Sequence, residues 1–242
     1  MEKSVLILGG NSDLGFALGK TFLNNGFKVL FASRDVTELS NRISQLSDQS
    51  HASTVSFDAL QFSAHRVWFD SLPFKPEITV CAFGTLGDQQ QAERNWELTK
   101  TILETNYIGA VSILNIIAEY YEQQKHGMIV GISSVAGDRG RQSNYLYGSA
   151  KAGFSEYLSG LRNRLFKSGV HVLTVKPGFL RTKMTAGLNL PPMLTDEPER
   201  AAKRIYNAVL RKRNVVYVKP VWFLIMLIIK NIPEIIFKRL KL

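Results

Sequence analysis

The chain has 242 residues, a formal net charge of +10 and a single cysteine, Cys81. It contains no internal repeat, no low-complexity tract and no linker rich in proline, glycine or serine, which excludes a repeat protein and argues against several domains. The lone cysteine excludes a disulfide framework, and no cluster of ligating residues predicts a metal site. Because a strand pattern begins where a secretory signal would lie, we expect a cytoplasmic protein.

Apolar runs with the length of buried strands alternate with amphipathic stretches of helical period over residues 1–219. This alternation predicts an α/β fold: one doubly wound, Rossmann-type parallel sheet with helices on both faces. The expected strands cover residues 3–8, 27–32, 55–58, 78–84, 128–132 and 170–175, and the clearest helices cover residues 14–23 and about 144–167.

The turn GGNSDLG joins the first expected strand to the first helix and contains Gly9 and Gly15. A glycine turn before a helix N-terminus lets backbone amides approach the pyrophosphate of a dinucleotide. Asp13 also lies in this turn, and its carboxylate would repel the pyrophosphate unless it turned away. A milder interpretation is that Ser12 or Asp13 caps the helix.

The segment GISSVAGDRGRQSNYLYGSAK, residues 131–151, contains the residues that best indicate chemistry. Tyr147 and Lys151 are four residues apart, so a helix places the phenol and the ammonium on one face. A nearby cation favours the phenolate of a tyrosine, which otherwise titrates at about pH 10. Ser134 follows the strand at 128–132 and should emerge at the carboxyl edge of the sheet, where ligands bind in such folds.

Together these motifs resemble the short-chain dehydrogenase/reductase family, whose catalytic serine, tyrosine and lysine have the spacing of Ser134, Tyr147 and Lys151. The resemblance covers about residues 3–218, with Asp13 replacing the family's second loop glycine. It implies that Asn106 supports the proton relay through water. It also implies a dinucleotide site made of Gly9, Asn11, Ser12, Gly15, Arg34, Asp58, Gly84, Lys151, Pro177, Gly178 and Thr182.

The tip of the second expected strand indicates which dinucleotide binds. Arg34 lies there, and a guanidinium suits the 2′-phosphate of NADP. Asp35 beside it keeps NAD as the alternative, because an acidic residue at this position favours the ribose hydroxyls of NAD. The sequence therefore predicts NADP, with NAD second.

The excess positive charge lies in the last 43 residues, because residues 1–199 hold equal numbers of basic and acidic side chains. The run VWFLIMLII, residues 221–229, is too short to span a bilayer, which needs about twenty apolar residues. With its flanking lysines and arginines, the extension at 220–242 is typical of an anchor on an anionic membrane surface. A subunit interface or core packing are alternatives. Nucleic-acid binding is disfavoured, because the basic residues alternate with aliphatic ones.

We expect the protein to reduce a ketone to a secondary alcohol. Ser134 would bind the carbonyl, Tyr147 would donate the proton, and Lys151 would lower the pKa of the tyrosine. Apolar residues in the lid, residues 183–198, indicate a lipid-like substrate. Within the family the chain is most similar to decaprenylphosphoryl 2-keto-pentose reductases, which implies a keto-sugar on a lipid carrier at the inner face of the membrane. A homodimer or homotetramer is expected. A reductase of a steroid or 3-oxo-lipid and a cofactor-sensing interaction protein are the alternatives.

Overall fold

The computed structural model describes residues 3–240, and its main element is a seven-stranded sheet with the order β3-β2-β1-β4-β5-β6-β9. All neighbouring strands in this sheet are parallel. The order reverses between β1 and β4, so the sheet is doubly wound and the predicted fold class is confirmed. The strands are β1 (Ser4–Leu8), β2 (Lys28–Ser33), β3 (Ala52–Ser56), β4 (Ile78–Cys81), β5 (Met128–Ile132), β6 (His171–Lys176) and β9 (Val215–Tyr217).

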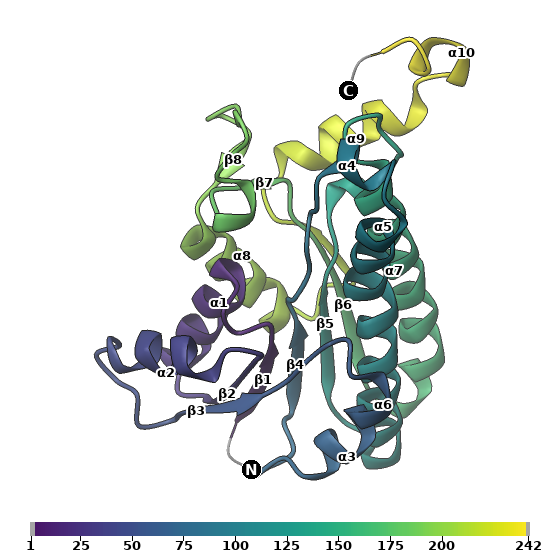
Figure 1. The fold of residues 1–242 in the computed structure, drawn as a ribbon. Coiled ribbons are helices and arrows are strands. Elements are labelled where there is room, and N and C mark those ends of the chain that lie inside the picture. The colour runs from purple at the N-terminus through teal and green to yellow at the C-terminus, as the bar shows by residue number, and fades with distance from the viewer. Residues whose placement is uncertain (1–2, 241–242) are drawn as a thin grey trace.

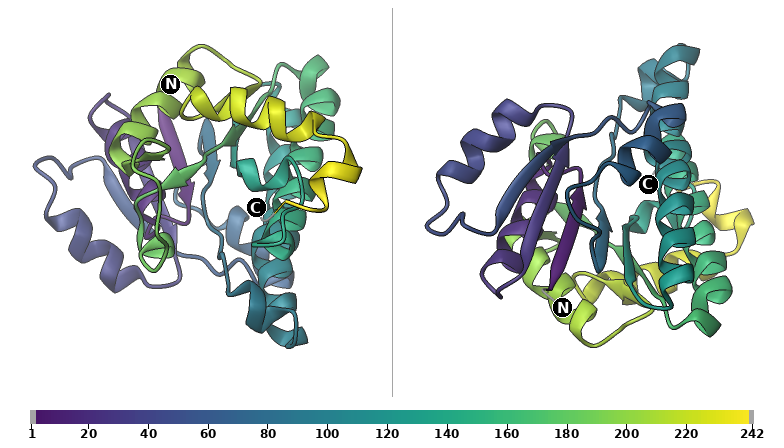
Figure 2. Two further views of the ribbon diagram at one scale, coloured as in Figure 1. Left: turned by 90° about the horizontal axis from the view of Figure 1, so that it is seen from above. Right: turned by 90° about the horizontal axis from the view of Figure 1, so that it is seen from below.

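Helices cover both faces of the sheet, as Figures 1 and 2 show. One layer holds α1, α2 and α8, and the other holds α3, α6 and α7, each with its own apolar core against the strands. The central strand β1 is buried along its whole length, because helices pack on both of its sides. The bounds are α1 (Asp13–Leu23), α2 (Val36–Ser44), α3 (His65–Asp70), α6 (Gly109–Gln124), α7 (Tyr145–Leu165) and α8 (Pro198–Leu210).

Local chemistry explains where several helices begin. The hydroxyl of Ser12 accepts a hydrogen bond from the Gly15 amide at the start of α1, with a distance of 3.0 Å. Asp35 caps α2 in the same way, and Pro198 occupies the first turn of α8, where its missing amide costs nothing. The strands β3 and β4 end earlier than predicted, before Asp58 and Gly84. Both residues therefore lie on loops beyond the sheet.

The longest helical segment contains an irregularity. A π-helical turn, Glu104–Ile108, joins α5 (Trp96–Leu103) to α6, and the short helix α4 (Gln89–Ala92) precedes them. Among the described residues, the stretch Trp96–Gln124 is the one with the length and apolar composition of a membrane span. Side chains of α6 such as Ile113, Leu114 and Ile117 are fully buried beneath the sheet, so core packing accounts for its apolar character.

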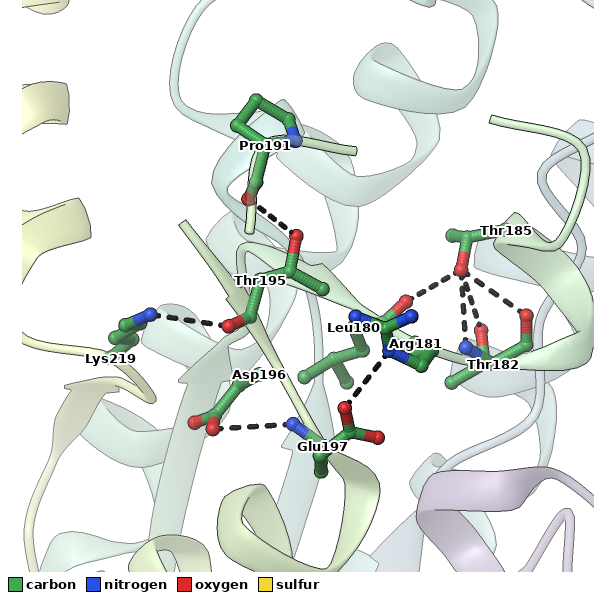
Figure 3. Close-up of polar contacts among 9 residues, drawn as sticks. All are labelled: Leu180, Arg181, Thr182, Thr185, Pro191, Thr195, Asp196, Glu197 and Lys219. Carbon is green, nitrogen blue, oxygen red and sulfur yellow. Dashed lines mark hydrogen bonds and ion pairs between the residues drawn. The ribbon is translucent and has the colours of Figure 1, made fainter. Parts of the chain in front are cut away.

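The lid leaves the sheet after β6 and is held by a second, two-stranded sheet. There β7 (Phe179–Leu180) pairs in parallel with β8 (Thr195–Asp196). Figure 3 shows the polar contacts around this sheet. Lys219 donates to the carbonyl of Thr195 at 3.1 Å, and Arg181 donates to the carboxylate of Glu197 at 2.9 Å. The base of the lid is thus tied to α8 and to the chain after β9.

The C-terminal extension forms two helices, α9 (Val221–Asn231) and α10 (Glu234–Phe237). Trp222 and Met226 of α9 are buried in a small apolar cluster with Val135, and Phe179 and Leu194 pack against it. One face of the apolar run is therefore core, which is one of the alternatives that the sequence left open.

Candidate active site

The serine that the sequence predicts to be catalytic lies where β5 leaves the sheet. Ser134 precedes a short 3₁₀ turn, Val135–Gly137, and its hydroxyl accepts a hydrogen bond from the Ala136 amide at 3.1 Å. The same hydroxyl lies near the phenol of Tyr147 and acts to lower its pKa. Tyr147 lies in the first turn of α7, so the structure brings the serine and the tyrosine together as their spacing predicted.

Lys151 follows one turn later on α7 and is buried. Its ammonium lies 5.7 Å from the centre of the Tyr147 ring and donates a hydrogen bond to the Ile132 carbonyl at 3.0 Å. Burial lowers the pKa of Lys151 to about 8, since an ammonium loses solvation in the core.

The pKa of Tyr147 differs from the expectation. Burial raises it to about 12, and the nearby Ser134 hydroxyl opposes this rise. The Lys151 ammonium is directed to the Ile132 carbonyl, and burial is the effect that dominates the pKa of Tyr147. In this state Tyr147 is a protonated phenol, which suits a proton donor.

Asn106 and Gly84 complete this side of the site. Asn106 is buried in the π-helical turn, and its amide group donates to the Thr85 carbonyl at 2.7 Å and accepts from the Thr85 amide at 3.2 Å. A Cβ on Gly84 would lie 2.6 Å from Oδ1 of Asn106 and 3.4 Å from Nζ of Lys151. Gly84 therefore lets the chain after β4 pass between Asn106 and Lys151. Wide helical turns are frequent at functional sites.

Sequence reasoning missed Ser133, the neighbour of Ser134. Its buried hydroxyl donates to the Lys151 carbonyl at 2.9 Å and contacts the Ser155 hydroxyl at 2.7 Å. This pair of contacts fixes α7 against the end of β5, and with it the position of Lys151. The serine doublet in the sequence was the available signal, but only the fold shows which hydroxyl faces the helix.

The glycine turn forms a cradle at the end of β1. Gly9 has a φ of +90°, and a Cβ there would lie 2.5 Å from the backbone nitrogen of Phe83. Ser12 donates to the Gly9 carbonyl at 2.8 Å, while a Cβ on Gly15 would lie 2.3 Å from the same oxygen. Oδ1 of Asn11 is buried without a hydrogen-bond partner within residues 3–240. An unpartnered buried acceptor can take a hydrogen bond from a hydroxyl or amino group of a dinucleotide, while the amides of the helix N-terminus suit its phosphates.

Asp13 is turned away from this cradle. Its carboxylate accepts a hydrogen bond from the Lys183 amide at 2.7 Å and lies 4.0 Å from the guanidinium of Arg42. Lys183 in turn reaches Glu38 of α2 at 3.1 Å. The negative charge that would oppose a pyrophosphate is therefore held by the first residue of the lid, and Ser12 rather than Asp13 caps α1.

The two residues expected to contact the adenosine part lie on loops. Arg34 is exposed beyond β2, and no hydrogen bond or ion pair in the described part of the chain engages its guanidinium. The carboxylate of Asp58 accepts from the Leu60 amide at 3.0 Å, which closes the turn after β3. Asp58 thus stabilises the turn in which it lies.

The turn Pro177, Gly178 closes the site from the side of β6. The Pro177 carbonyl accepts a hydrogen bond from the Val135 amide at 3.0 Å, so this turn and the Ser134 loop are joined. A Cβ on Gly178 would lie 1.9 Å from Nε1 of Trp222, which shows how closely α9 covers the turn. Thr182 is engaged with Thr185, as Figure 3 shows.

Two further polar atoms between Ser134 and Tyr147 have no partner among the described residues. They are Nε of Arg141 and Oδ1 of Asn144, both buried. Burial lowers the pKa of Arg141, while the charge of Asp138 raises it. Unpartnered buried polar atoms in the segment that joins Ser134 to Tyr147 are candidates for ligand contacts. The sequence offered no signal for them beyond their position between the two catalytic residues.

Comparisons with known proteins agree with this geometry. Residues 3–192 match the family described as short chain dehydrogenase. An uncharacterized oxidoreductase of Mycobacterium tuberculosis is 34% identical over 243 residues, covering 98% of this chain and 96% of the relative. A serine 3-dehydrogenase of Agrobacterium fabrum is 30% identical over 192 residues, covering 76% of this chain and 75% of the relative.

Solved structures share the fold. ElxO with NADP bound has a TM-score of 0.80 at 23% identity, covering 90% of this chain and 97% of its own. A short-chain dehydrogenase from Burkholderia cenocepacia in complex with NADP has a TM-score of 0.83 at 18% identity, covering 98% and 97%. The prediction that the protein is an enzyme is confirmed. The alternative, a non-enzymatic interaction protein, has no support in these comparisons. The chain belongs to the short chain dehydrogenase family and is an NAD(P)-dependent oxidoreductase.

Proposed function

We propose that the protein reduces a ketone to a secondary alcohol with NADPH. The observation that supports this most directly is the meeting of Ser134, Tyr147 and Lys151 at the carboxyl edge of β5, beside Gly84 and Asn106. When bound, NADPH supplies hydride to the carbonyl carbon.

The side chains have separate roles in this proposal. The hydroxyl of Ser134 donates a hydrogen bond to the substrate oxygen, and the phenol of Tyr147 donates the proton that the oxygen gains as its negative charge develops. Lys151 stabilises the phenolate that remains and binds the ribose hydroxyls of the cofactor. Asn106 supports reprotonation of Tyr147 through water.

NADP is the proposed dinucleotide, with NAD as the alternative. Arg34 offers an exposed guanidinium at the tip of β2, which suits a 2′-phosphate. Asp13 is paired elsewhere, and the turn of Gly9, Asn11 and Gly15 lies at the N-terminus of α1, which favours a pyrophosphate. ElxO and the Burkholderia enzyme are NADP complexes, which supports the same choice.

The substrate that we propose is a ketone on a hydrophobic carrier, with a keto-sugar on a polyprenyl phosphate as the leading candidate. The lid exposes Met184, Leu188 and Met193, which would cover an apolar chain. Arg141 and Asn144 would bind the polar part of such a molecule. Steroids and 3-oxo-lipids are the other substrates to compare.

The decisive experiment replaces Tyr147 by phenylalanine. We expect Tyr147→Phe to lower kcat for ketone reduction by about 1,000-fold, because the proton donor is lost. Binding of NADPH, followed by its fluorescence, should change less than twofold. The matched control is Tyr145→Phe on the same helix, an exposed tyrosine that should leave kcat unchanged. Retention of turnover in Tyr147→Phe would reject the proposed chemistry.

A panel of ketone substrates tests whether the substrate is carried on a lipid. We expect NADPH oxidation with lipid-linked keto-sugars to exceed that with steroids, 3-oxo-lipids and small soluble ketones. Faster turnover of a small soluble ketone would contradict the lipid-linked substrate.

The remaining partners are also proposals. We propose a homodimer or homotetramer, to be measured by light scattering on the purified chain. We further propose that residues 1–219 form the dinucleotide-binding and catalytic domain, and that residues 220–242 associate with the inner face of the cell membrane. No nucleic acid is involved in this function.

A further inference from the structure

The C-terminal helices expose an apolar surface that the fold does not use. Trp222 and Met226 face the core, whereas the opposite side of α9 is open to solvent. We define the docking face as six side chains of α9 and α10, each 52–67% exposed: Phe223, Leu224, Leu227, Ile228, Ile235 and Ile236. Large apolar side chains exposed in this number on two successive helices mark an interaction site in a folded protein.

The charges around the docking face are positive. Lys230, Lys238 and Arg239 are exposed on or beside the same two helices. Glu234 is the only acidic residue after Arg200, and its carboxylate is paired with Arg139 at 2.8 Å. The face therefore presents apolar side chains with exposed cations on the same two helices, a composition that complements an anionic lipid surface.

The position of the face relates it to the active site. Figure 1 shows α9 and α10 at the end of the molecule that also bears the lid, beyond the carboxyl edge of the sheet. Seen from above in Figure 2, α9 runs across this end from the side of α8 towards the side of α7. The segment between β7 and β8, which carries the exposed lid residues Met184, Leu188 and Met193, lies at the same end.

We propose that the docking face binds an anionic lipid bilayer, with α9 lying in the plane of the surface and the lid turned towards the lipid. An eleven-residue helix is only about 16 Å long and cannot span a hydrocarbon core of about 30 Å. This inference rests on the proposed function in one respect: it states where the enzyme meets a ketone that is carried by a lipid.

A second copy of the chain fits this face less well. A two-fold contact through α9 and α10 would bring Lys230, Lys238 and Arg239 towards their own counterparts, and like charges across an interface oppose association. Anionic headgroups turn the same cations into favourable contacts.

Contacts of Arg139 join α9 and α10 to the loop that follows Ser134. Arg139, which follows the Ser134 turn, donates to the carbonyls of Ile229 at 2.7 Å and Ile232 at 2.6 Å, and its guanidinium lies 3.7 Å from the centre of the Phe237 ring. Its neighbour Asp138 accepts from the hydroxyl of Tyr217 at 2.6 Å. A helix docked on the bilayer would therefore hold the Ser134 loop in a constant orientation to the membrane.

The structure also shows why deletion of residues 221–242 would be a poor test. The deletion removes Trp222 and Met226 and uncovers Val135 and Gly178, so loss of membrane binding could not be separated from loss of the active site. The informative variant changes only the outer side: Leu224→Glu, Leu227→Glu and Ile228→Glu combined in the full chain.

The experiment measures co-flotation with vesicles made of equal parts phosphatidylglycerol and phosphatidylcholine. The wild-type chain should float with these vesicles, bind phosphatidylcholine alone at least tenfold more weakly, and dissociate as salt is raised. The triple variant should lose at least tenfold in binding to the mixed vesicles. Its turnover of a soluble ketone should stay within twofold, because the changed side chains lie outside the site.

The matched control is Val67→Glu with Phe166→Glu. Both side chains are exposed and apolar, but they lie on α3 and after α7, away from the docking face. This control adds the same type of charge and should bind vesicles like the wild type.

The outcomes separate the two proposals. If the wild-type chain fails to float, or if the triple variant floats unchanged, the docking proposal is overturned. Failure to float together with conversion of an oligomer to a monomer by the triple variant would assign the face to a second copy of the chain. If the chain floats as expected but reduces no ketone with NADPH, the proposed function fails and the docking face stands.

Discussion

The glycine turn and helix α9 both border the catalytic edge of the sheet, but they are built from different kinds of contact. The turn depends on backbone conformation within a few residues, such as the positive φ of Gly9 and the cap of α1 by Ser12. Helix α9 depends on side chains that meet residues far away in the chain, such as Trp222 with Gly178 and Val135. The conformation of the glycine turn is thus set largely by neighbouring residues, whereas α9 is positioned by contacts at long range, including one with Gly178 of the predicted dinucleotide site.

The largest effect should follow from Trp222→Ala. This change removes an indole that is buried against Phe179 and hydrogen-bonded to the Leu194 carbonyl at 3.0 Å, and we expect it to lower the free energy of unfolding by about 3–5 kcal/mol. The loss of unfolding free energy is measured by denaturant unfolding. Ile228→Ala on the exposed side of α9 is the control and should cost less than about 0.5 kcal/mol. Equal effects for both variants would mean that α9 has no distinct inner face.

A smaller loss of stability should follow from Gly9→Ala on the cofactor side. The new Cβ would lie 2.5 Å from the backbone of Phe83 at a φ of +90°, and we expect a cost of about 2 kcal/mol together with loss of NADPH binding. Calorimetry and fluorescence titration measure the two effects. Gly160→Ala, within α7 and with open space around it, should instead stabilise the chain by about 0.5–1 kcal/mol. NADPH affinity unchanged in Gly9→Ala would contradict the cradle.

The variant Arg34→Ala tests whether the protein prefers NADP to NAD. Removing the guanidinium should raise KM for NADPH about tenfold, which corresponds to about 1.4 kcal/mol. KM for NADH is the internal control and should stay constant, because NADH has no 2′-phosphate. Equal changes for both cofactors would assign Arg34 to another role.

The smallest effect concerns pH. The pKa of Lys151 is lowered to about 8, so its ammonium is half deprotonated at that pH and is lost as pH rises further. The pKa of Tyr147 is raised to about 12, so the phenol keeps its proton over the same range. We expect kcat for reduction to fall by about half at pH 8 and to continue falling above it. A rate that is constant from neutral pH to pH 10 would remove Lys151 from the rate-determining chemistry.

The predictions from sequence succeeded where a pattern is repeated over a few residues. The apolar run before Ser134 predicted the strand 128–132, which is β5, and the spacing of Tyr147 and Lys151 placed both on one helix. They were less accurate at strand ends. Asp58 was expected to close a strand but lies beyond it, because the polar side chains at the end of β3 do not mark where pairing stops.

The interactions of individual charges were not predictable in this way. The sequence shows Asp13 in a turn that should accept an anion, but its partners Lys183 and Arg42 come from the lid and from α2. The net rise of the Tyr147 pKa was also not predicted, since it comes from burial in the folded protein.

The sequence by itself determined the alternation of strands and helices, the order of the motifs and the spacing of the catalytic residues, because each depends on the period and chemistry of neighbouring positions. Only the tertiary structure decided which side of α9 is core, what holds Asp13, and that Arg139 joins the Ser134 loop to the C-terminal helices. These outcomes depend on which surfaces meet when distant segments pack together, and a local pattern carries no information about that meeting.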